Sequence, residues 1–391
     1  MSSRFTTPRD LYFGPGSISY LKELKGHKAI VVVGGGSLKK SGYLDKILGY
    51  LAEAKLETKV IDGIEPDPSV ESVLNGAKIM REFGPDWIIG VGGGSPIDAA
   101  KAMWVFYEYP DTKFEDILNP FTIPPLRTKA RLVGIGTTSG TASEVTACSV
   151  ITDYKTGIKY PLADFQFNPD IAIVDPELTY SLPGNMIAFT GVDALTHAIE
   201  AYVAKGRSPF SDAPGLMAIE MIFGNLERSY KGDLEARNNM HYAQCLAGLS
   251  FTNALVGIAH SMAHKVGAIW KVPHGCANAI FLPNVILYNS KDPVSLTRFA
   301  NIARHLRLTG FTDQALCDSL VQAIRDLNRK VNIPYTLKDF GVQEPDFRAN
   351  LSLVTERALA DICTFFNPRE IDQEKMERLF WCMYLGTDCF F

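Results

Sequence analysis

One carboxylate and three imidazoles in the second half of the chain have the types and spacing needed to hold a single divalent metal ion. Asp193 and His197 stand one helical turn apart in TGVDALTHAIEAY, followed by His260 in GIAHSMAHKVGA and His274 in VPHGCANAI. Such a spacing puts Asp193 and His197 on one face of a helix, where they can chelate together. His260 and His264 form a second pair of this kind. An Asp and three His suit Fe(II) or Zn(II) and leave positions open for a substrate oxygen, which predicts Lewis-acid catalysis.

The clustering of the histidines decides between two interpretations, packed core residues and metal ligands. A histidine on an apolar helix is more often a packed core residue than a ligand, but five of the seven histidines lie between His197 and His274. Burying several imidazoles without a shared purpose would be costly, which favours a joint role. We interpret His27, His241 and His305 as ordinary surface or helix-end residues.

Length and composition limit the possible function classes. At 391 residues the chain exceeds one ordinary core, so two domains are expected. The net charge of -4, without a Lys/Arg block, gives no electrostatic footprint for nucleic acid or an anionic membrane and favours a small-molecule partner. The sequence has no signal peptide pattern and no run of the ~18 apolar residues that a membrane span needs. The seven cysteines are scattered without CxxC spacing, so we expect reduced thiols and a cytoplasmic protein.

The hydrophobic pattern changes near the middle of the chain. In the first half, apolar runs such as KAIVVVGGGS and PDWIIGVGGGS alternate with amphipathic stretches, which predicts a parallel sheet covered by helices. Further strands are expected in RLVGIGTT, SEVTACSVITD and IAIVDPEL. Beyond Leu182-Pro183-Gly184 the pattern is almost entirely helical. The sequence thus predicts a dinucleotide-binding α/β domain over residues 1–183 and a helical, metal-binding catalytic domain over residues 184–391.

Two glycine-rich turns could hold phosphate groups. Gly92-Gly93-Gly94-Ser95 follows one predicted strand and opens a helix, where free backbone amides and the helix dipole favour a pyrophosphate. A second run, Gly34-Gly35-Gly36-Ser37, ends an earlier strand. Neither matches GxGxxG, so plain glycine turns are the alternative. A third polar loop, Thr137 to Thr141, could donate hydroxyls to a diphosphate or to a nicotinamide amide.

The turn after the first glycine-rich strand bears on the choice of nucleotide. An acidic residue at such a tip commonly binds the adenosine ribose and repels a 2'-phosphate. This chain has Gly35, Gly36 and Ser37 there, followed by Lys39-Lys40. The space at the glycines, the Ser37 hydroxyl and the lysine charge would accept a 2'-phosphate, which predicts NADP(H) in preference to NAD(H). The alternative is that the two lysines are only the solvated start of a helix.

Several separated motifs then carry a resemblance to a known family. GGGSPIDAAKA, TTSGTASEVT, ITDYKTGIKYPL, DALTHAIEAY, HSMAHKVGA, PHGCANA and the closing CTFFNPRE occur in the order typical of the iron-containing, or group III, alcohol dehydrogenases. The resemblance runs essentially from end to end. The GGGS-LKK form of the first turn is similar to NADPH-dependent butanol and alcohol dehydrogenases of fermenting anaerobes, whereas the NAD-dependent lactaldehyde reductase type has Asp at the position of Gly35.

The resemblance implies a role for each matching residue. Asp193, His197, His260 and His274 would bind Fe(II), with Zn(II) as a common occupant, and His264 would lie near the nicotinamide and relay a proton. The residues implied in cofactor binding, besides Gly35, Gly36 and Ser37, are Asp67 and Lys159 at the ribose, Gly94 and Ser95 at the pyrophosphate, Thr137, Thr138 and Thr146 along the groove, and Leu178 on the adenine side. The residues implied in the substrate pocket are Cys148, Phe251 and Cys363.

The implied fold is the dehydroquinate synthase-like, iron-dependent alcohol dehydrogenase fold: an amino-terminal Rossmann-like domain, an all-α carboxy-terminal domain and a site in the cleft between them. The implied activity is interconversion of short-chain primary alcohols and aldehydes with NADP(H), in a homodimer or larger assembly. One departure is Phe365-Phe366, where family members usually have small residues; the rings could narrow the pocket or pack in the core.

Other activities remain open within this architecture. A polyol or glycerol dehydrogenase would also use a metal and a nicotinamide, with NAD(H). A dehydroquinate-synthase-like lyase would need basic residues for its substrate, whereas the surroundings of His260 and His274 are apolar. A helical bundle with a structural metal would not explain the glycine-rich turns.

Overall fold

The computed structural model describes residues 4–391 and forms two compact units, with the boundary between Ser181 and Leu182. The boundary expected from the sequence, after Pro183, lies just beyond this point. Residues 1–3 of the expected first domain lie outside the described residues. The two units are described separately.

The amino-terminal unit is built on a six-stranded parallel sheet with the order β1-β8-β5-β4-β2-β3. Its strands are β1 (Asp10–Phe13), β2 (Lys28–Gly34), β3 (Glu57–Ile64), β4 (Trp87–Gly92), β5 (Arg131–Gly136) and β8 (Ile171–Val174). The central strands are continuous apolar runs because helices cover both faces of the sheet. The predicted α/β architecture is therefore confirmed for this unit.

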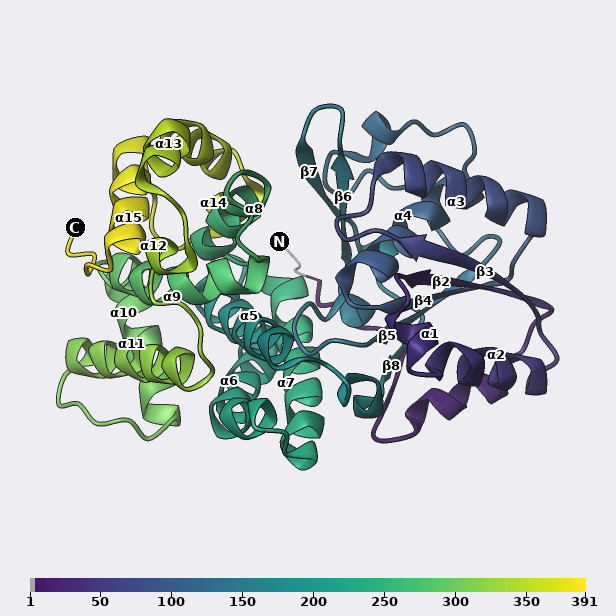
Figure 1. Cartoon of the computed structure of the whole chain (residues 1–391), viewed down its shortest axis with the longest axis horizontal. Coiled ribbons are helices and arrows are strands. Elements are labelled where there is room, and N and C mark those ends of the chain that lie inside the picture. Colours follow the sequence, from purple (N-terminus) through teal and green to yellow (C-terminus); the bar gives the residue numbers. More distant parts are fainter. Residues whose placement is uncertain (1–3) are drawn as a thin grey trace. The chain divides into compact units, whose positions relative to one another are not determined.

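Alternate residues of the strands pack on opposite faces of the sheet. The helical elements of this unit are η1 (Ser17–Glu23), α1 (Ser37–Lys40), α2 (Tyr43–Glu53), α3 (Val70–Phe83), α4 (Gly94–Glu108), η2 (Phe114–Ile117), η3 (Ser143–Val145), η4 (Phe165–Phe167) and η5 (Pro176–Thr179). Ile30 and Val32 of β2 pack with α3 and α4, whereas Val31 and Val33 pack with α2 and η1. Figure 1 shows α3 and α4 on one side of the sheet and α2 on the other. Since all six strands are parallel, the turns that follow them lie at one edge of the sheet.

A separate antiparallel hairpin replaces one predicted strand of the main sheet. Strand β6 (Cys148–Asp153) pairs with β7 (Ile158–Ala163) alone. The prediction of one strand through SEVTACSVITD is wrong for its first part, because Ser143–Val145 form the 3-10 helix η3 after Ala142 in the left-handed region, with φ 53°. That helix lies against β5, where a Cβ on Gly134 would approach Glu144 Cα to 2.8 Å.

The carboxy-terminal unit is helical, as predicted. From Leu182 onward every regular element that the structure describes is a helix. These are α5 (Gly184–Val203), α6 (Pro209–Tyr230), α7 (Leu234–Ala254), α8 (Ile258–Trp270), α9 (His274–Asn289), α10 (Pro293–His305), α11 (Asp313–Lys330), α12 (Leu337–Phe340), α13 (Glu344–Leu359), α14 (Ile362–Phe366) and α15 (Gln373–Leu385). Helices α5 and α9 are buried along almost their whole length, which is why their sequences are apolar on every side.

Within residues 4–391, no single helix has the length and apolar composition to cross a membrane. One pair, α7 and α8, satisfies those criteria jointly, with a bend of 105° between the two helices.

Candidate metal and cofactor sites

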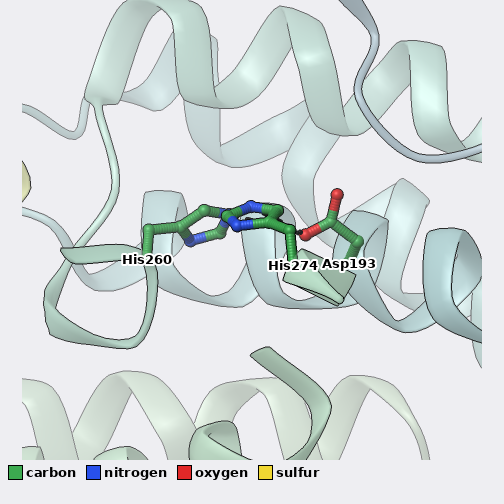
Figure 2. A group of neighbouring side chains, drawn as sticks. All are labelled: Asp193, His260 and His274. Atoms are coloured by element: carbon green, nitrogen blue, oxygen red, sulfur yellow. Dashed lines mark ion pairs between the residues drawn. The ribbon is translucent and has the colours of Figure 1, made fainter. Parts of the chain in front are cut away.

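Three helices of the carboxy-terminal unit bring the predicted ligands together. Helix α5 carries Asp193 and His197, α8 carries His260, and α9 begins at His274. The Oδ1 atom of Asp193 lies 3.5 Å from His274 Nε2 and 3.8 Å from His260 Nε2, and these side chains converge in Figure 2. The Oδ2 atom of Asp193 lies 4.0 Å from His197 Nδ1. Asp193, His260 and His274 thus place three ligand atoms within 4.8 Å of one another, and His197 lies beside this group through its contact with Asp193.

The protonation and pairing of these donors suit a cation. His197 Nδ1 and His260 Nε2 are buried and have no hydrogen-bond partner among the described residues, which is costly unless a ligand satisfies them. Burial lowers the pKa of His197 to about 3 and that of His260 to about 4, so both rings are neutral near pH 7. For Asp193, burial raises the pKa, but the three neighbouring histidines and Asn278 outweigh it and the net shift is downward. An ionised carboxylate beside neutral imidazoles is the donor set that binds Fe(II) or Zn(II).

A buried carboxylate behind His260 was not recognised from the sequence. Glu200 of α5 lies one turn beyond His197, and its Oε2 is 2.7 Å from His260 Nδ1. The amides of Ala259 and His260 at the start of α8 also donate to Glu200, at 2.8 and 3.4 Å. Burial raises the pKa of Glu200 to about 7, while these amides lower it. An ionised Glu200 fixes the proton of His260 on Nδ1 and leaves the Nε2 lone pair facing Asp193.

Two residues near the start of α9, the polar Asn278 and the small Gly275, hold this helix against α5. Asn278, one turn after His274, donates through Nδ2 to Asp193 Oδ1 at 2.7 Å. Gly275 allows close approach of the two helices, because a Cβ there would lie 2.2 Å from the carbonyl oxygen of Phe189. Both residues therefore fix where the His274 ring meets Asp193.

His264 belongs to a second polar cluster beside the first. Its Nδ1 lies 3.0 Å from Asp361 Oδ2, and Lys265 Nζ is 2.7 Å from the same oxygen. Burial raises the pKa of Asp361, but His264 and Lys265 lower it far more, so Asp361 is ionised and His264 Nδ1 must be the donor. The Nε2 atom of His264 is then the one left to accept a proton.

Cys363 lies close enough to Asp361 and His264 for three ligand atoms to fall within 4.8 Å of one another. This group does not suit a metal ion, because the ammonium of Lys265 already neutralises Asp361. Burial also raises the pKa of the Cys363 thiol well above its usual value, which keeps it protonated.

The other residues predicted for the substrate pocket occupy varied positions. Phe251 of α7 stacks on the His197 ring, with centroids 4.2 Å apart and planes inclined by 14°. Cys148 begins β6 in the amino-terminal unit and is partly exposed. Phe365 is 81% exposed within the chain, so the alternative that its ring packs in the core is wrong.

One histidine differs from its sequence interpretation. His241 was expected at the surface or at a helix end, but it lies in the middle of α7 and is fully buried, which lowers its pKa to about 3. The segment around it, NNMHYAQC, also buries the polar side chain of Gln244, so its polarity does not show which side faces the core. His27 and His305 are exposed, as expected, and His305 Nε2 lies 2.9 Å from Glu220.

The predicted cofactor residues of the amino-terminal unit gather at the carboxyl edge of the sheet. Gly35, Gly36 and Ser37 follow β2, and Gly94 and Ser95 begin α4 directly after β4. Open space surrounds the position that a Cβ on Gly35 would take, and a Cβ on Gly94 would meet Thr141 at 3.3 Å. This edge, where backbone amides and helix starts are exposed, is where parallel α/β sheets bind nucleotides.

Further predicted residues join this edge from the neighbouring turns. Thr137 and Thr138 follow β5, and the Thr137 amide donates to Gly92 O at 2.8 Å. The Asp67 amide donates to Ser95 Oγ at 3.2 Å, and Lys159 Nζ of β7 lies 2.7 Å from Asp67 Oδ2.

Leu178 and the pair Lys39-Lys40 differ in burial. Leu178 of η5 is 5% exposed and packs in the core formed with α2 and η1. Lys39 and Lys40 are both exposed, and Lys39 forms an ion pair with Asp62 of β3.

Together, the glycine-rich turns of the parallel sheet and the Asp–His cluster of the helical unit define the class, a metal-containing nicotinamide dehydrogenase. The chain belongs to the iron-containing alcohol dehydrogenase family: the model for iron-containing alcohol dehydrogenase matches residues 8–176, and that for the C-terminal part of the Fe-containing alcohol dehydrogenase family matches residues 187–384. It is therefore an oxidoreductase.

Individual relatives match nearly the whole length of this chain. The chain is 59% identical over 385 residues to the NADPH-dependent butanol dehydrogenase of Clostridium saccharobutylicum, covering 98% of this chain and 99% of that protein. It is 40% identical over 410 residues to the bifunctional aldehyde-alcohol dehydrogenase of Escherichia coli K12, covering 97% of this chain and 46% of that protein. The crystal structure of a 1,3-propanediol oxidoreductase superposes with a TM-score of 0.92 at 36% identity, covering 98% of this chain and 100% of that one.

Proposed function

We propose that this protein interconverts short-chain primary alcohols and aldehydes, such as butanol and butanal, by hydride transfer with NADP(H) at an Fe(II) site. The observation that carries the proposal is the convergence of Asp193, His260 and His274, with His197 beside Asp193 and two buried imidazole nitrogens that lack a partner within the described residues. The 59% identity to an NADPH-dependent butanol dehydrogenase supports the substrate class and the cofactor.

The four residues would hold the metal through one carboxylate and three imidazoles. When bound, the metal would supply Lewis-acid polarisation of the substrate oxygen and the nicotinamide would supply or accept the hydride. Glu200 fixes the tautomer of His260, and Asn278 orients Asp193. Phe251 stacks on one face of the His197 ring. These contacts hold the donors in place before any ligand arrives.

His264 is the group proposed to move the proton. Because Asp361 accepts from Nδ1, the lone pair of His264 lies on Nε2, which can receive a proton from an alcohol or return one to a nascent alkoxide. The His264 side chain is 20% exposed within the chain, so the ring can also exchange protons with water.

The preference for NADP(H) is proposed to depend on the turn after β2. No acidic side chain occupies Gly35 to Ser37, and the space beside Gly35 could receive a 2'-phosphate. The neighbouring ammonium groups of Lys39 and Lys40 add positive charge, although Asp62 partly neutralises Lys39. The remaining cofactor residues predicted above stay part of this proposal.

Two further properties are also proposals. We infer a homodimer or larger assembly from the family resemblance. A reducing, cytoplasmic environment is consistent with all seven cysteines being thiols rather than disulfides.

The test is anaerobic reconstitution of metal-free protein with Fe(II) or Zn(II), followed by the oxidation of NADPH and of NADH during butanal reduction. Metal-dependent turnover that favours NADPH is expected, with a chelated sample as control. Turnover only with dihydroxyacetone or glycerol and NAD(H) would instead identify a polyol dehydrogenase. No turnover with any short aldehyde or polyol would refute the proposal.

A further inference from the structure

Helix α4 carries two ionisable residues to which the proposed function assigns no role. Asp98 and Lys101 belong to the motif GGGSPIDAAKA, and they are 8% and 0% exposed. A lysine is almost never fully buried unless its charge is compensated. The helix begins at Gly94, so whatever these side chains hold is held at a fixed place relative to the glycine-rich turn.

Lys101 is bound entirely by the segment that leads into β6. Its Nζ donates to Thr146 O at 2.7 Å, to Thr146 Oγ1 at 3.1 Å and to Cys148 O at 2.8 Å. An ammonium group has three N–H donors, and here each has an acceptor. The side chain therefore links the middle of α4 to the backbone of two residues proposed to border the cofactor and the substrate.

Asp98 forms a parallel link further along the same strand. Its Oδ2 accepts from the Val150 amide at 3.0 Å, and its backbone carbonyl accepts from Ser149 Oγ at 2.8 Å. Burial raises the pKa of Asp98 to about 6, although Lys101 opposes this rise. Burial lowers the pKa of Lys101, and Asp98 partly restores it. Burial therefore outweighs the attraction between the two groups, and each is held by its hydrogen bonds to the segment from Thr146 to Val150.

The hairpin is held partly by apolar packing, because Ile151 and Leu162 are buried in the core with α3 and α4, and partly by polar links. In the part of the chain that the structure describes, β6 pairs with β7 in a two-stranded sheet that is separate from the six-stranded sheet. An isolated two-stranded hairpin is only marginally stable, so other contacts must fix its position. Near the end of β6, Thr152 forms an isolated parallel β-bridge with Ser69. Lys101 and Asp98 bind the other end of the strand, which begins at Cys148.

We propose that Lys101, assisted by Asp98, is a positioning residue that holds Thr146 and Cys148 at a fixed distance from the pyrophosphate turn at Gly94. The inference rests on the proposed function, because it assumes that these residues border bound NADP(H). Lys101 acts through the strand and does not touch the cofactor. Its removal should therefore loosen the cofactor groove without emptying the metal site, all of whose donors belong to the other unit.

The experiment compares Lys101→Met with a control on the same helix. Lys101→Met removes the three donors and keeps an unbranched chain of similar size. Met103→Ala removes packing between α4 and α3, where Met103 Sδ would lie 2.4 Å from a Cβ on Gly76, and leaves β6 alone. The measurements on full-length, metal-loaded protein are the dissociation constant for NADPH by nicotinamide fluorescence, the hydrogen exchange of residues 146–150, the melting temperature and the metal content.

Lys101→Met is expected to weaken NADPH binding at least tenfold and to speed exchange at residues 146–150, with metal content unchanged. Met103→Ala should lower the melting temperature without either effect. The inference would be overturned if Lys101→Met and Met103→Ala had the same melting temperature and bound NADPH equally weakly. It would also be overturned if Lys101→Met bound NADPH with wild-type affinity.

A milder variant keeps the test decisive should Lys101→Met not fold. Ser149→Ala removes one link to Asp98 and is expected to weaken NADPH binding a few-fold with local loss of exchange protection; unchanged values would count against the inference. Wild-type protein that binds no NADPH would refute the proposed function together with this inference, whereas NADPH binding by wild type and Lys101→Met alike would refute the inference alone.

Discussion

Replacing Glu200 with Gln should weaken metal binding although Glu200 is not itself a proposed ligand. Three donors converge on its two oxygens: the ring Nδ1 of His260 and the amides of Ala259 and His260. A glutamine has one oxygen and one NH2 group, so it must place a donor against one of these donors. If the NH2 faces His260 Nδ1, the ring proton moves to Nε2, and the lone pair that should face the metal is lost.

The size of this effect follows from the role of such carboxylates. Loss of the partner of a ligating histidine typically costs about 10- to 100-fold in metal affinity or activity. Since a tenfold change corresponds to about 1.4 kcal/mol, the expected loss is roughly 1.4–2.8 kcal/mol of binding free energy. The protein should still fold, because the exchange conserves volume.

The assay is competition for Fe(II) or Zn(II) against a chelator of known affinity, followed by the melting temperature of the metal-free protein. Glu220→Gln is a matched control, because Glu220 also contacts a histidine, His305, at 2.9 Å, but on the exposed surface. We expect wild-type metal affinity in Glu220→Gln. Equal metal affinity in Glu200→Gln and Glu220→Gln would show that the carboxylate does not control His260.

The remaining predictions concern other parts of the two sites. His264→Ala should keep the metal but lower kcat, measured with metal content on the same sample, and a metal-free variant would disprove its role as a proton relay. Gly35→Asp should raise the KM for NADPH about 10- to 100-fold by like-charge repulsion, without loss of melting temperature because the space there is open; an unchanged ratio of NADPH to NADH efficiency would contradict this. Phe365→Ala should shift the preference between ethanal and butanal if the exposed ring narrows the pocket, and equal preference would exclude that role. The metal-free protein should lose stability as pH falls from about 6.5 towards 4, because His197 and His260 have folded pKa values below their unfolded values and so bind protons more readily when unfolded. Chemical unfolding at several pH values checks this, and a flat profile over that range would contradict it.

The sequence predicted the parts of the site that depend on local spacing. Asp193 and His197 share a helix face because of helical periodicity, and their chemistry pointed to a metal before the fold was known. Glu200 could have been found in the same way, since it lies two turns beyond Asp193 on that face. Its role was missed because a carboxylate in a helix ordinarily indicates a solvated position.

Other features depend on contacts that no local pattern encodes. Asp361 meets His264 across 97 positions of sequence, and only the packed fold brings them together. The alternation of strands and helices predicted the parallel sheet, but not that residues 148–163 form a separate hairpin. That outcome depends on the turn at Ala142 and on glycines in β5, whose effects are tertiary. His241 was misplaced because polar neighbours in sequence do not reveal which face of α7 is buried.

The most direct test of the central claim is an anaerobic titration of Fe(II) into metal-free protein, with NADPH oxidation in the presence of butanal as the readout. If Asp193 and the three histidines form one catalytic site, activity should rise linearly and stop at about one metal ion per chain, and Asp193→Ala should show no rise. Full activity before metal is added, or an unchanged titration in Asp193→Ala, would contradict the account.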